Sequence, residues 1–563
     1  MNEIQPLFPQ RDSLQDARTT TDYDLREQTN SLMNLGDKLI VDEIETGEVE
    51  KGFSWRKLWK YTGPGIYLFL LERQLTLVHV DSHAIRLTPN DILSIISLRF
   101  LMSIAYVDPG NLEADLQTGA TAGYALLWLL LYAHIAGLLI QCLSSRAGVV
   151  TGQHLAQLIR NHYPRPVALA LYIITELAII GSDIQEIIGT AIALKILFNL
   201  PLWVGTLLTT MDTFTFMFLQ NYGVRKLEAF FMALIATMAG CFWIEMFLSH
   251  PDPVEIGKGI LIPLVPSNAV VQAVALIGAV IMPHNLYLHS ALVMTRKREP
   301  VSTDKLKEAN FYFGIESAFA LFCSYLINLA IVVVFASVFF VPEEVKSMPG
   351  LFDAADVLYK TLGNGAKYLW ALGLLAAGQS STMTGTLAGQ YVMEGFFGKI
   401  FKKTWHRVAI TRSIALIPSM LVAIFAVDHF DVMGELLNVL QSLCLPTALL
   451  PILKLTSSNL IMGSTFSNRR FWKFVTWCLA IIIMCFNMYL FVVYLEDLDN
   501  KILGYFWAIV YFVFIAYLAL LPIQPQILIT KDADLEGYKA IANHPPPLLE
   551  GGNLNEMAVE DED

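Results

Sequence analysis

Apolar runs of about 20 residues recur along this chain, from about residue 93 to about residue 522. As an α-helix, a run of this length crosses the roughly 30 Å hydrocarbon core of a bilayer. Only 16% of the residues are charged, whereas soluble globular domains average about 25%. Backbone groups inside a bilayer must pair with protein, which restricts a spanning chain to helices or closed barrels. The runs therefore predict an all-α polytopic membrane protein, and neither enzymatic activity nor a resident cofactor is expected.

The runs divide the chain into about twelve predicted transmembrane helices. They cover 93–106 with 109–120, 123–143, 167–198, 201–220, 227–248, 269–294, 310–340, 366–390, 409–427, 432–455, 472–494 and 503–522. Basic residues gather in alternate connections, with Arg146, Arg160 and Arg165 in one and Arg296, Lys297, Arg298, Lys305 and Lys307 in another. Because Lys and Arg are enriched in cytoplasmic loops, this asymmetry predicts cytoplasmic N- and C-termini.

The two ends of the chain are polar and carry much of the formal net charge of −12. Such acidic segments are typical of solvated tails, so no nucleic-acid partner is expected. The partners implied are membrane lipid and small ions, with no obligate protein partner. The six Cys lie in or beside apolar runs and form no CxxC pair, so they are interpreted as core residues.

Two of the predicted spans are interrupted in the same way. The first contains Asp108-Pro-Gly-Asn111, and the sixth contains Met282-Pro-His-Asn285. Proline removes a backbone donor and breaks a helix, and irregular backbone at membrane depth is tolerated only inside protein or beside a cavity. Breaks at corresponding positions, separated by intervening spans, indicate an inverted repeat with a binding site near the midplane. The alternative is a pair of ordinary packing kinks.

The residues at the breaks suggest a metal site. Asp108 supplies a carboxylate, Asn111 an amide oxygen and Met282 a thioether. Ala105 and Ala279 each lie three residues before a break, where unwinding would free their carbonyls. Oxygen ligands alone suit Mg²⁺ or Ca²⁺, whereas a thioether favours softer metals. The set predicts Mn²⁺ or Fe²⁺, with Co²⁺, Zn²⁺ or Cd²⁺ as companions; for Met282 alone, core filling is the alternative.

Ionisable residues also lie inside predicted spans. They are His284 and His289 in the sixth, Asp183 and Glu186 in the third, and Arg412 in the ninth. Ionisable groups within a membrane are costly, so they pair or line a pathway. Imidazoles and carboxylates exchange protons near neutral pH, which is what a proton relay requires. The alternative is a structural ion pair, for instance between Arg412 and Glu186.

These motifs resemble those of the natural-resistance-associated macrophage protein (Nramp) family. The resemblance is carried by Asp108-Pro-Gly-Asn111, by Ala279-Val-Ile-Met-Pro-His284 and by the segment 378–397, GQSSTMTGTLAGQYVMEGFF. It implies a LeuT-type fold of two inverted five-helix repeats and two C-terminal helices. It implies proton-coupled import of divalent transition metals by alternating access. Metal ligands are implied at the positions Asp108, Asn111, Ala105, Ala279 and Met282, and a proton pathway through Asp108, His284, Asp183, Glu186 and Arg412.

The expected organisation follows from the resemblance and the spans. It comprises a cytoplasmic N-terminal tail (1–52), a first repeat (53–248), a second repeat (269–455), two accessory helices (472–522) and a cytoplasmic C-terminal tail (523–563). Retention of Met282 and Ala279 argues against the magnesium- and aluminium-transporting branches of the family. In span ten, Asn438 is a possible additional ligand, and Cys444 departs from the family pattern.

One departure bears directly on activity. In the family, the stretch matching Thr62–Gly65 runs almost directly into the one matching Phe100–Tyr106, but here residues 66–99 intervene. The insertion falls in the inner half of the first span, which by resemblance moves as the inner gate, so charges there predict an inactivated isoform. Retained intron sequence and a tolerated insertion are alternative interpretations. A metal-collecting motif, His79-x-Asp81-x-His83, is the other interpretation.

Two rival functions stay open on the sequence. One is another LeuT-fold carrier, for amino acids or sodium-coupled solutes, in which the breaks would bind a carboxylate; Asp108 facing Met282 is poor chemistry for an anionic substrate. The other is a non-transporting, metal-responsive signalling protein, which the short C-terminal segment disfavours. The sequence Glu3-Ile-Gln-Pro-Leu7-Phe8 resembles an acidic dileucine signal and favours a vacuolar or endosomal membrane over the plasma membrane.

Overall fold

The computed structural model describes residues 107–209, 211, 236–237, 239–240, 242–295, 303–340, 350–398, 404–425, 430–497 and 501–524. The insertion 66–99, both tails and Ala105 lie outside these residues. The described part consists of helices and their connections, which confirms the predicted all-α class. Its helices are α6 (Pro109–Ala122), α7 (Leu127–Thr151), α8 (Leu155–His162), α9 (Arg165–Phe198), α12 (Pro253–Leu261), η2 (Ser267–Ala269), α13 (Val270–Val280), α14 (Pro283–Leu292), η3 (Val293–Thr295), α15 (Thr303–Phe339), α16 (Leu351–Leu362), α17 (Asn364–Phe397), α18 (Thr404–Phe425), α19 (Phe430–Ser457), α20 (Asn459–Phe466), α21 (Arg470–Asp497) and α22 (Lys501–Leu520).

The long helices coincide with predicted spans. Within the described residues, six segments are long and apolar enough to cross a membrane: α7, α9, the η2–α14 stretch, α15, most of α19 and most of α21. The predicted span 366–390 falls inside α17, and the predicted spans 409–427 and 503–522 largely coincide with α18 and α22. Large apolar side chains such as Phe471 and Phe474 on α21 are exposed, as expected of a surface that faces lipid.

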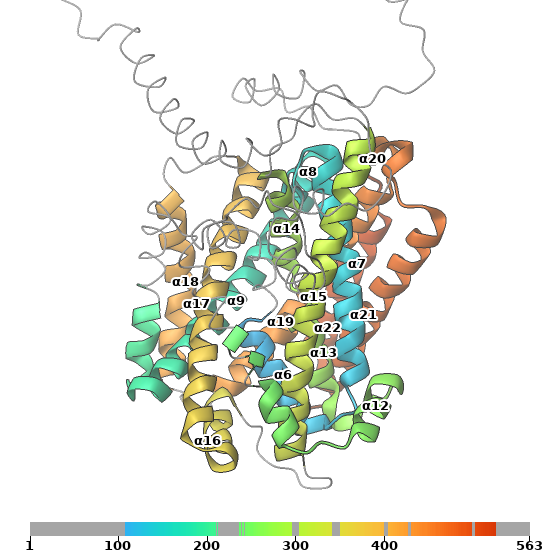
Figure 1. Ribbon diagram of the computed structural model, residues 1–563. Helices are drawn as coiled ribbons and strands as arrows, with labels where there is room; N and C mark the ends of the chain where they lie inside the picture. The colour runs from blue at the N-terminus through green and yellow to red at the C-terminus, as the bar shows by residue number, and fades with distance from the viewer. Residues whose placement is uncertain are drawn as a thin grey trace, which may run out of the picture. The chain divides into compact units, whose positions relative to one another are not determined.

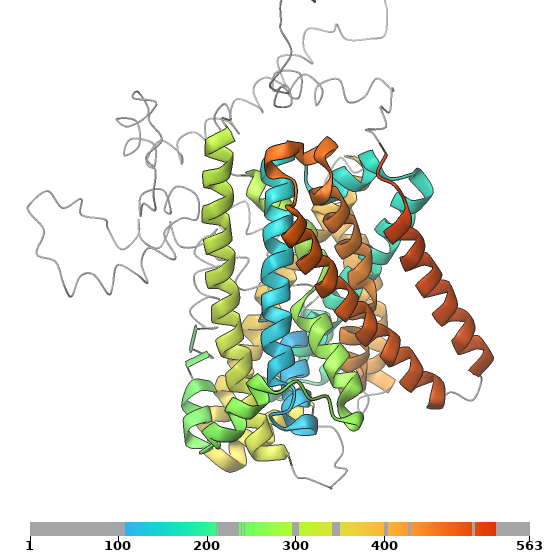
Figure 2. The same ribbon diagram turned by 90° about the vertical axis from the view of Figure 1, so that its right-hand side faces the viewer.

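The helices surround a packed centre formed by α6, α13 and α19 (Figure 1). Helix α9 packs along α17, and α15 packs against both α6 and α7. In Figure 2, α15 (yellow-green) runs beside α7 (cyan), while α21 and α22 (orange to red) lie on the other side of α7. This arrangement places α6 and α13, which carry the predicted metal ligands, in the interior.

The predicted interruption of the sixth span is visible in the backbone, and α6 begins at the proline where the first span was predicted to break. Asp108 is extended (φ −100°, ψ 170°), and α6 begins at Pro109. In the sixth span, α13 ends at Val280, the backbone stays extended through Met282 (φ −72°, ψ 129°), and α14 begins at Pro283. Proline fits the first helical position because its missing N–H has no partner there anyway. The prediction of a broken sixth span is therefore confirmed.

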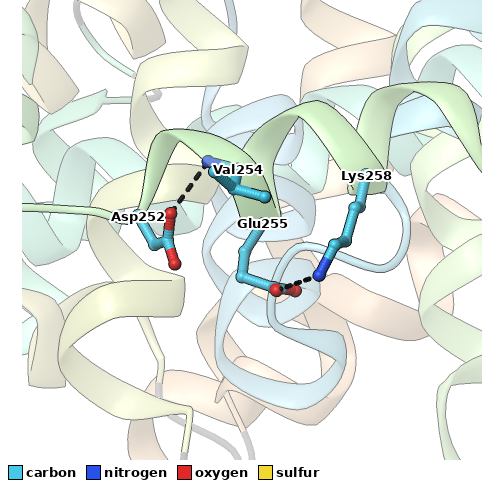
Figure 3. Close-up of polar contacts among 4 residues, drawn as sticks. All are labelled: Asp252, Val254, Glu255 and Lys258. Atoms are coloured by element: carbon cyan, nitrogen blue, oxygen red, sulfur yellow. Dashed lines mark hydrogen bonds and ion pairs between the residues drawn. The ribbon is translucent and has the colours of Figure 1, made fainter.

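A short helix, α12, packs against α7. Asp252 caps its first turn by accepting from the Val254 amide at 2.8 Å, and Lys258 pairs with Glu255 at 2.6 Å (Figure 3). Both members of the pair are about half exposed, and such pairs contribute little to stability. Gly259 lies against the Tyr124 carbonyl just beyond α6, so no larger residue fits there.

Candidate metal-binding site

The first break presents a carboxylate held by its own helix. Asp108 Oδ1 accepts from the Asn111 amide at 2.8 Å and from Asn111 Nδ2 at 2.7 Å. Both side chains are almost fully buried. An acidic N-cap at a helix start is stabilised by the backbone donors and by the helix dipole. Asn111 Oδ1 is buried and accepts no hydrogen bond from the described residues, so it remains available as an oxygen ligand.

The second break presents a thioether and free carbonyls. Met282 is buried and makes no side-chain cap hydrogen bond to α14. Ala279 lies in the last turn of α13, where carbonyl groups have no amide partner in the helix. Helices α13 and α6 pack directly on each other. The structure thus brings the elements of Asp108, Asn111, Ala279 and Met282 together, whereas Ala105 lies outside the described residues.

The predicted proton-pathway residues fall into two groups. Asp183 and Glu186 share one face of α9, and a Cβ on Gly385 of α17 would lie 3.2 Å from an oxygen of each. His284 and His289 are buried on α14. His289 Nε2 lies 3.5 Å from Ser317 Oγ of α15, and His284 Nδ1 finds no hydrogen-bond partner in the described part. Arg412 lies on α18, but its side chain is outside the described residues, so the alternative of an ion pair with Glu186 stays a prediction.

Asn438 is fully buried, and both ends of its amide are engaged. Its Nδ2 donates to the Gly110 carbonyl at 3.0 Å. Its Oδ1 accepts from Gln185 Nε2 at 2.8 Å, and the same nitrogen lies 3.0 Å from the Gly434 carbonyl. The predicted additional ligand therefore lies directly beside the first break, with its amide orientation fixed by α6 and α9.

Gln185 was not expected to belong to the site, although it lies between Asp183 and Glu186 in the third span. A polar residue on a buried helix is the signal that could have identified it.

Asp115 on α6 is a second buried polar residue that was not expected at the site: it is fully buried, and neither carboxylate oxygen has a hydrogen-bond partner within the described part. Elsewhere in those residues, no cluster of three His, Cys, Asp or Glu side chains could hold a metal.

The architecture and the buried polar residues at two helix breaks define an α-helical membrane transporter. Its fold is LeuT-like. A manganese transporter of Eremococcus coleocola has a similar structure, with a TM-score of 0.68 at 28% identity, covering 84% of this chain and 96% of that one.

The model of the natural resistance-associated macrophage protein-like family, Nramp, matches residues 99–493. The metal transporter nramp1 homolog of Dictyostelium discoideum is 48% identical over 456 residues, 80% of this chain and 78% of its own length. Metal transporter Nramp2 of Arabidopsis thaliana is 44% identical over 512 residues, 89% of this chain and 90% of its own length. The chain belongs to the Nramp family, and it is an integral multi-pass membrane protein and not an enzyme.

Proposed function

We propose that this chain carries divalent transition-metal ions, Mn²⁺ and Fe²⁺ foremost, toward the cytosol together with protons. The observation that carries the proposal is the pair of adjacent helix breaks, one bearing Asp108 and Asn111 and the other Met282. Relatives that share most of the chain are named metal transporters, and a protein of similar structure is named a manganese transporter. Co²⁺, Zn²⁺ and Cd²⁺ are proposed as further substrates.

Each ligand has a distinct part in the proposed site. Asp108 balances the charge of the cation, and Asn111 supplies a neutral oxygen. Met282 contributes a thioether, which discriminates against Mg²⁺ and Ca²⁺ because these ions prefer oxygen. The carbonyls of Ala105 and Ala279 complete the set. Breaks in both helices let these groups approach one ion while the rest of the backbone stays hydrogen-bonded.

Proton coupling is proposed through the ionisable residues near this site. Asp183 and Glu186 on α9 lie at the contact with α17, and His284 and His289 follow the second break on α14. Imidazole and carboxylate groups in such positions can exchange protons as access alternates between the two sides. Arg412 is proposed as the cationic partner of this relay. Both termini are proposed to be cytoplasmic, in a vacuolar or endosomal membrane.

The insertion 66–99 motivates an alternative, that this isoform is inactive or serves as a non-transporting, metal-responsive signalling protein. The match to the family model begins at residue 99, the last residue of the insertion. A partly charged segment at this place would hinder movement of the inner half of the first span. Transport by the chain without 66–99, but not by the full chain, would support this alternative.

Proteoliposomes test the proposal. Purified full-length protein is reconstituted, and Mn²⁺ uptake is followed with an inward proton gradient, together with the internal pH. Uptake that acidifies the lumen and collapses without the gradient is expected. The 66–99 deletion is measured in parallel. Absence of uptake by both proteins would contradict the proposed function.

A further inference from the structure

We infer that Gln185 is a positioning residue for the metal-binding turn and acts through Asn438. The inference rests on the proposed function, because that function assigns metal binding to the turn at Asp108. Gln185, Asn438 and Gly110, here called the amide latch, join α9 and α19 to the first turn of α6 by hydrogen bonds. Gly110 directly precedes Asn111, whose amide groups hold the Asp108 carboxylate.

The latch lies in direct contact with the turn. A Cβ on Gly110 would lie 2.8 Å from Gln185 Oε1 and 3.0 Å from Gln185 Cδ, so glycine leaves the space that the amide occupies. Gln185 is 3% exposed and Asn438 is 0% exposed. At this burial, water does not replace a lost partner. Removal of the Gln185 amide would therefore deprive Asn438 Oδ1 and the Gly434 carbonyl of the hydrogen bonds that it donates.

The latch also fixes the orientation of the Asn438 amide. Asn438 turns Nδ2 toward Gly110 and Oδ1 toward Gln185, so its amide cannot rotate without losing both bonds. Gln185 reaches the Gly434 carbonyl as well, one turn earlier on α19, and so holds the backbone of that helix. A binding site whose supporting residues are locked in place binds more tightly than one that must be ordered by the ligand. Loss of Gln185 should weaken metal binding even though Asp108 and Asn111 are unchanged.

A second buried glutamine provides a matched control. Gln441 on α19 is 0% exposed and donates from Nε2 to the Ala178 carbonyl of α9 at 2.9 Å. It therefore joins the same two helices through the same chemical group, about one turn from Asn438. The described contacts of its side chain do not include α6. A general need for glutamine between α9 and α19 would make Gln185 and Gln441 equally important.

The experiment compares Gln185→Met with Gln441→Met, since methionine keeps the length of the side chain and removes the amide. Gln185→Glu removes the same donor with a different side chain, so a folding defect of one variant does not end the test. Asn438→Leu and its combination with Gln185→Met complete a double-mutant cycle. Two experiments are made on full-length protein. Uptake of Mn²⁺ in proteoliposomes gives the KM and the maximal rate, and hydrogen–deuterium exchange of residues 107–122 is followed in detergent.

We expect Gln185→Met to raise the KM about tenfold, with a maximal rate within about twofold of the unchanged protein, and to speed exchange at the start of α6. Gln441→Met should change neither the uptake kinetics nor the exchange at the start of α6. Adding Asn438→Leu to Gln185→Met should have little further effect, since both act through one contact. Equal behaviour of Gln185→Met and Gln441→Met would overturn the latch and leave the proposed function intact. If the unchanged protein shows no uptake, the proposed function fails and only the exchange comparison tests the latch. Faster exchange in Gln185→Met alone then supports the latch, and equal exchange in Gln185→Met and Gln441→Met overturns it.

Discussion

The two interrupted spans share a backbone design and differ in how the interruption is stabilised. In each, an extended residue precedes a proline at the first helical position, Asp108 before Pro109 and Met282 before Pro283. Asp108 caps its own helix through its carboxylate, whereas Met282 makes no cap hydrogen bond. The first break is thus held by directional polar contacts.

The second break is held by close backbone packing. Gly278, one turn before Met282, lies against α19 so tightly that a Cβ there would lie 2.6 Å from the Ser442 nitrogen, and it would also collide with the Asn438 carbonyl. Met282 itself makes no side-chain cap hydrogen bond to α14. The first break thus holds a carboxylate in place, whereas the second presents a thioether. In the proposed site we therefore expect affinity and selectivity to depend on different residues.

Substitution of the charged cap should have the largest effect. Asp108→Ala removes both the proposed anionic ligand and the cap of α6, and we expect Mn²⁺ uptake to fall by more than about 100-fold. Asp252→Ala is the matched control, because Asp252 also caps a helix, α12, by accepting a backbone hydrogen bond. Loss of a cap alone costs about 1 kcal/mol. If both variants lost uptake equally, capping and not metal binding would explain the role of Asp108.

A methyl group at the second break should disturb its packing. Gly278→Ala forces α13 and α19 apart, because the neighbouring atoms belong to backbone, and we expect a loss of about 1–3 kcal/mol of stability. Gly257→Ala on α12 is the control, since no atom lies within 4 Å of a Cβ at that position. Thermal unfolding in detergent measures the difference. A Gly278→Ala protein as stable as Gly257→Ala would show that the second break does not depend on close packing.

Selectivity for Mn²⁺ over Ca²⁺ and Mg²⁺ should depend more on the Met282 thioether than on the Asp108 charge. Met282→Ala should let Ca²⁺ and Mg²⁺ inhibit Mn²⁺ uptake about tenfold more strongly, while Mn²⁺ uptake itself persists. The matched control is Met462→Ala, because Met462 is equally buried but lies on α20. Competition assays in proteoliposomes measure the change. Unchanged competition in Met282→Ala would mean that Met282 fills the core.

The sequence was sufficient to predict where the helices break, but not the contacts from other helices that hold the breaks in place. Asp108-Pro and Met282-Pro combine a proline with a polar or soft residue inside an apolar run, so a local pattern predicted both interruptions. The hydrogen bond between Gln185 and Asn438 joins residues 253 apart, and that between Asn438 and Gly110 joins residues 328 apart. Contacts of this separation depend on helix packing, which no local pattern specifies.

The short helices outside the spans were also beyond local prediction. Helices α8, α12, α16 and α20 have 8 to 12 residues each, and a search for apolar runs of about 20 residues passes over them. Most of the predicted spans correspond to long helices in the described residues, whereas 201–220 and 227–248 are described only in part. The domain boundaries of the two repeats and the ligand and proton roles of individual residues stay predictions.

One of these short helices supports the second break and should make that support sensitive to pH. The Leu155 amide at the start of α8 donates to Ser290 Oγ on α14 at 2.9 Å. His154 precedes α8, and burial, with a smaller contribution from Arg160, lowers its pKa from 6.5 to about 4. The folded protein therefore favours neutral His154. Because the unfolded chain takes up the proton near pH 6.5, the stabilisation is full above that pH and is lost as the pH falls toward 4.

From neutral pH to pH 5, protonation linked to His154 should remove about 2 kcal/mol of stability. His154→Gln has no proton to gain, so its unfolding temperature should fall less over the same range than that of the unchanged protein. Scanning fluorimetry in detergent at several pH values between 7 and 5 gives the two slopes. No described hydrogen bond joins the first break to α8, so hydrogen exchange at the start of α6 should not depend on this pH change, whereas exchange in α14 should. Equal pH dependence of the unfolding temperature in both proteins would show that His154 does not support the second break.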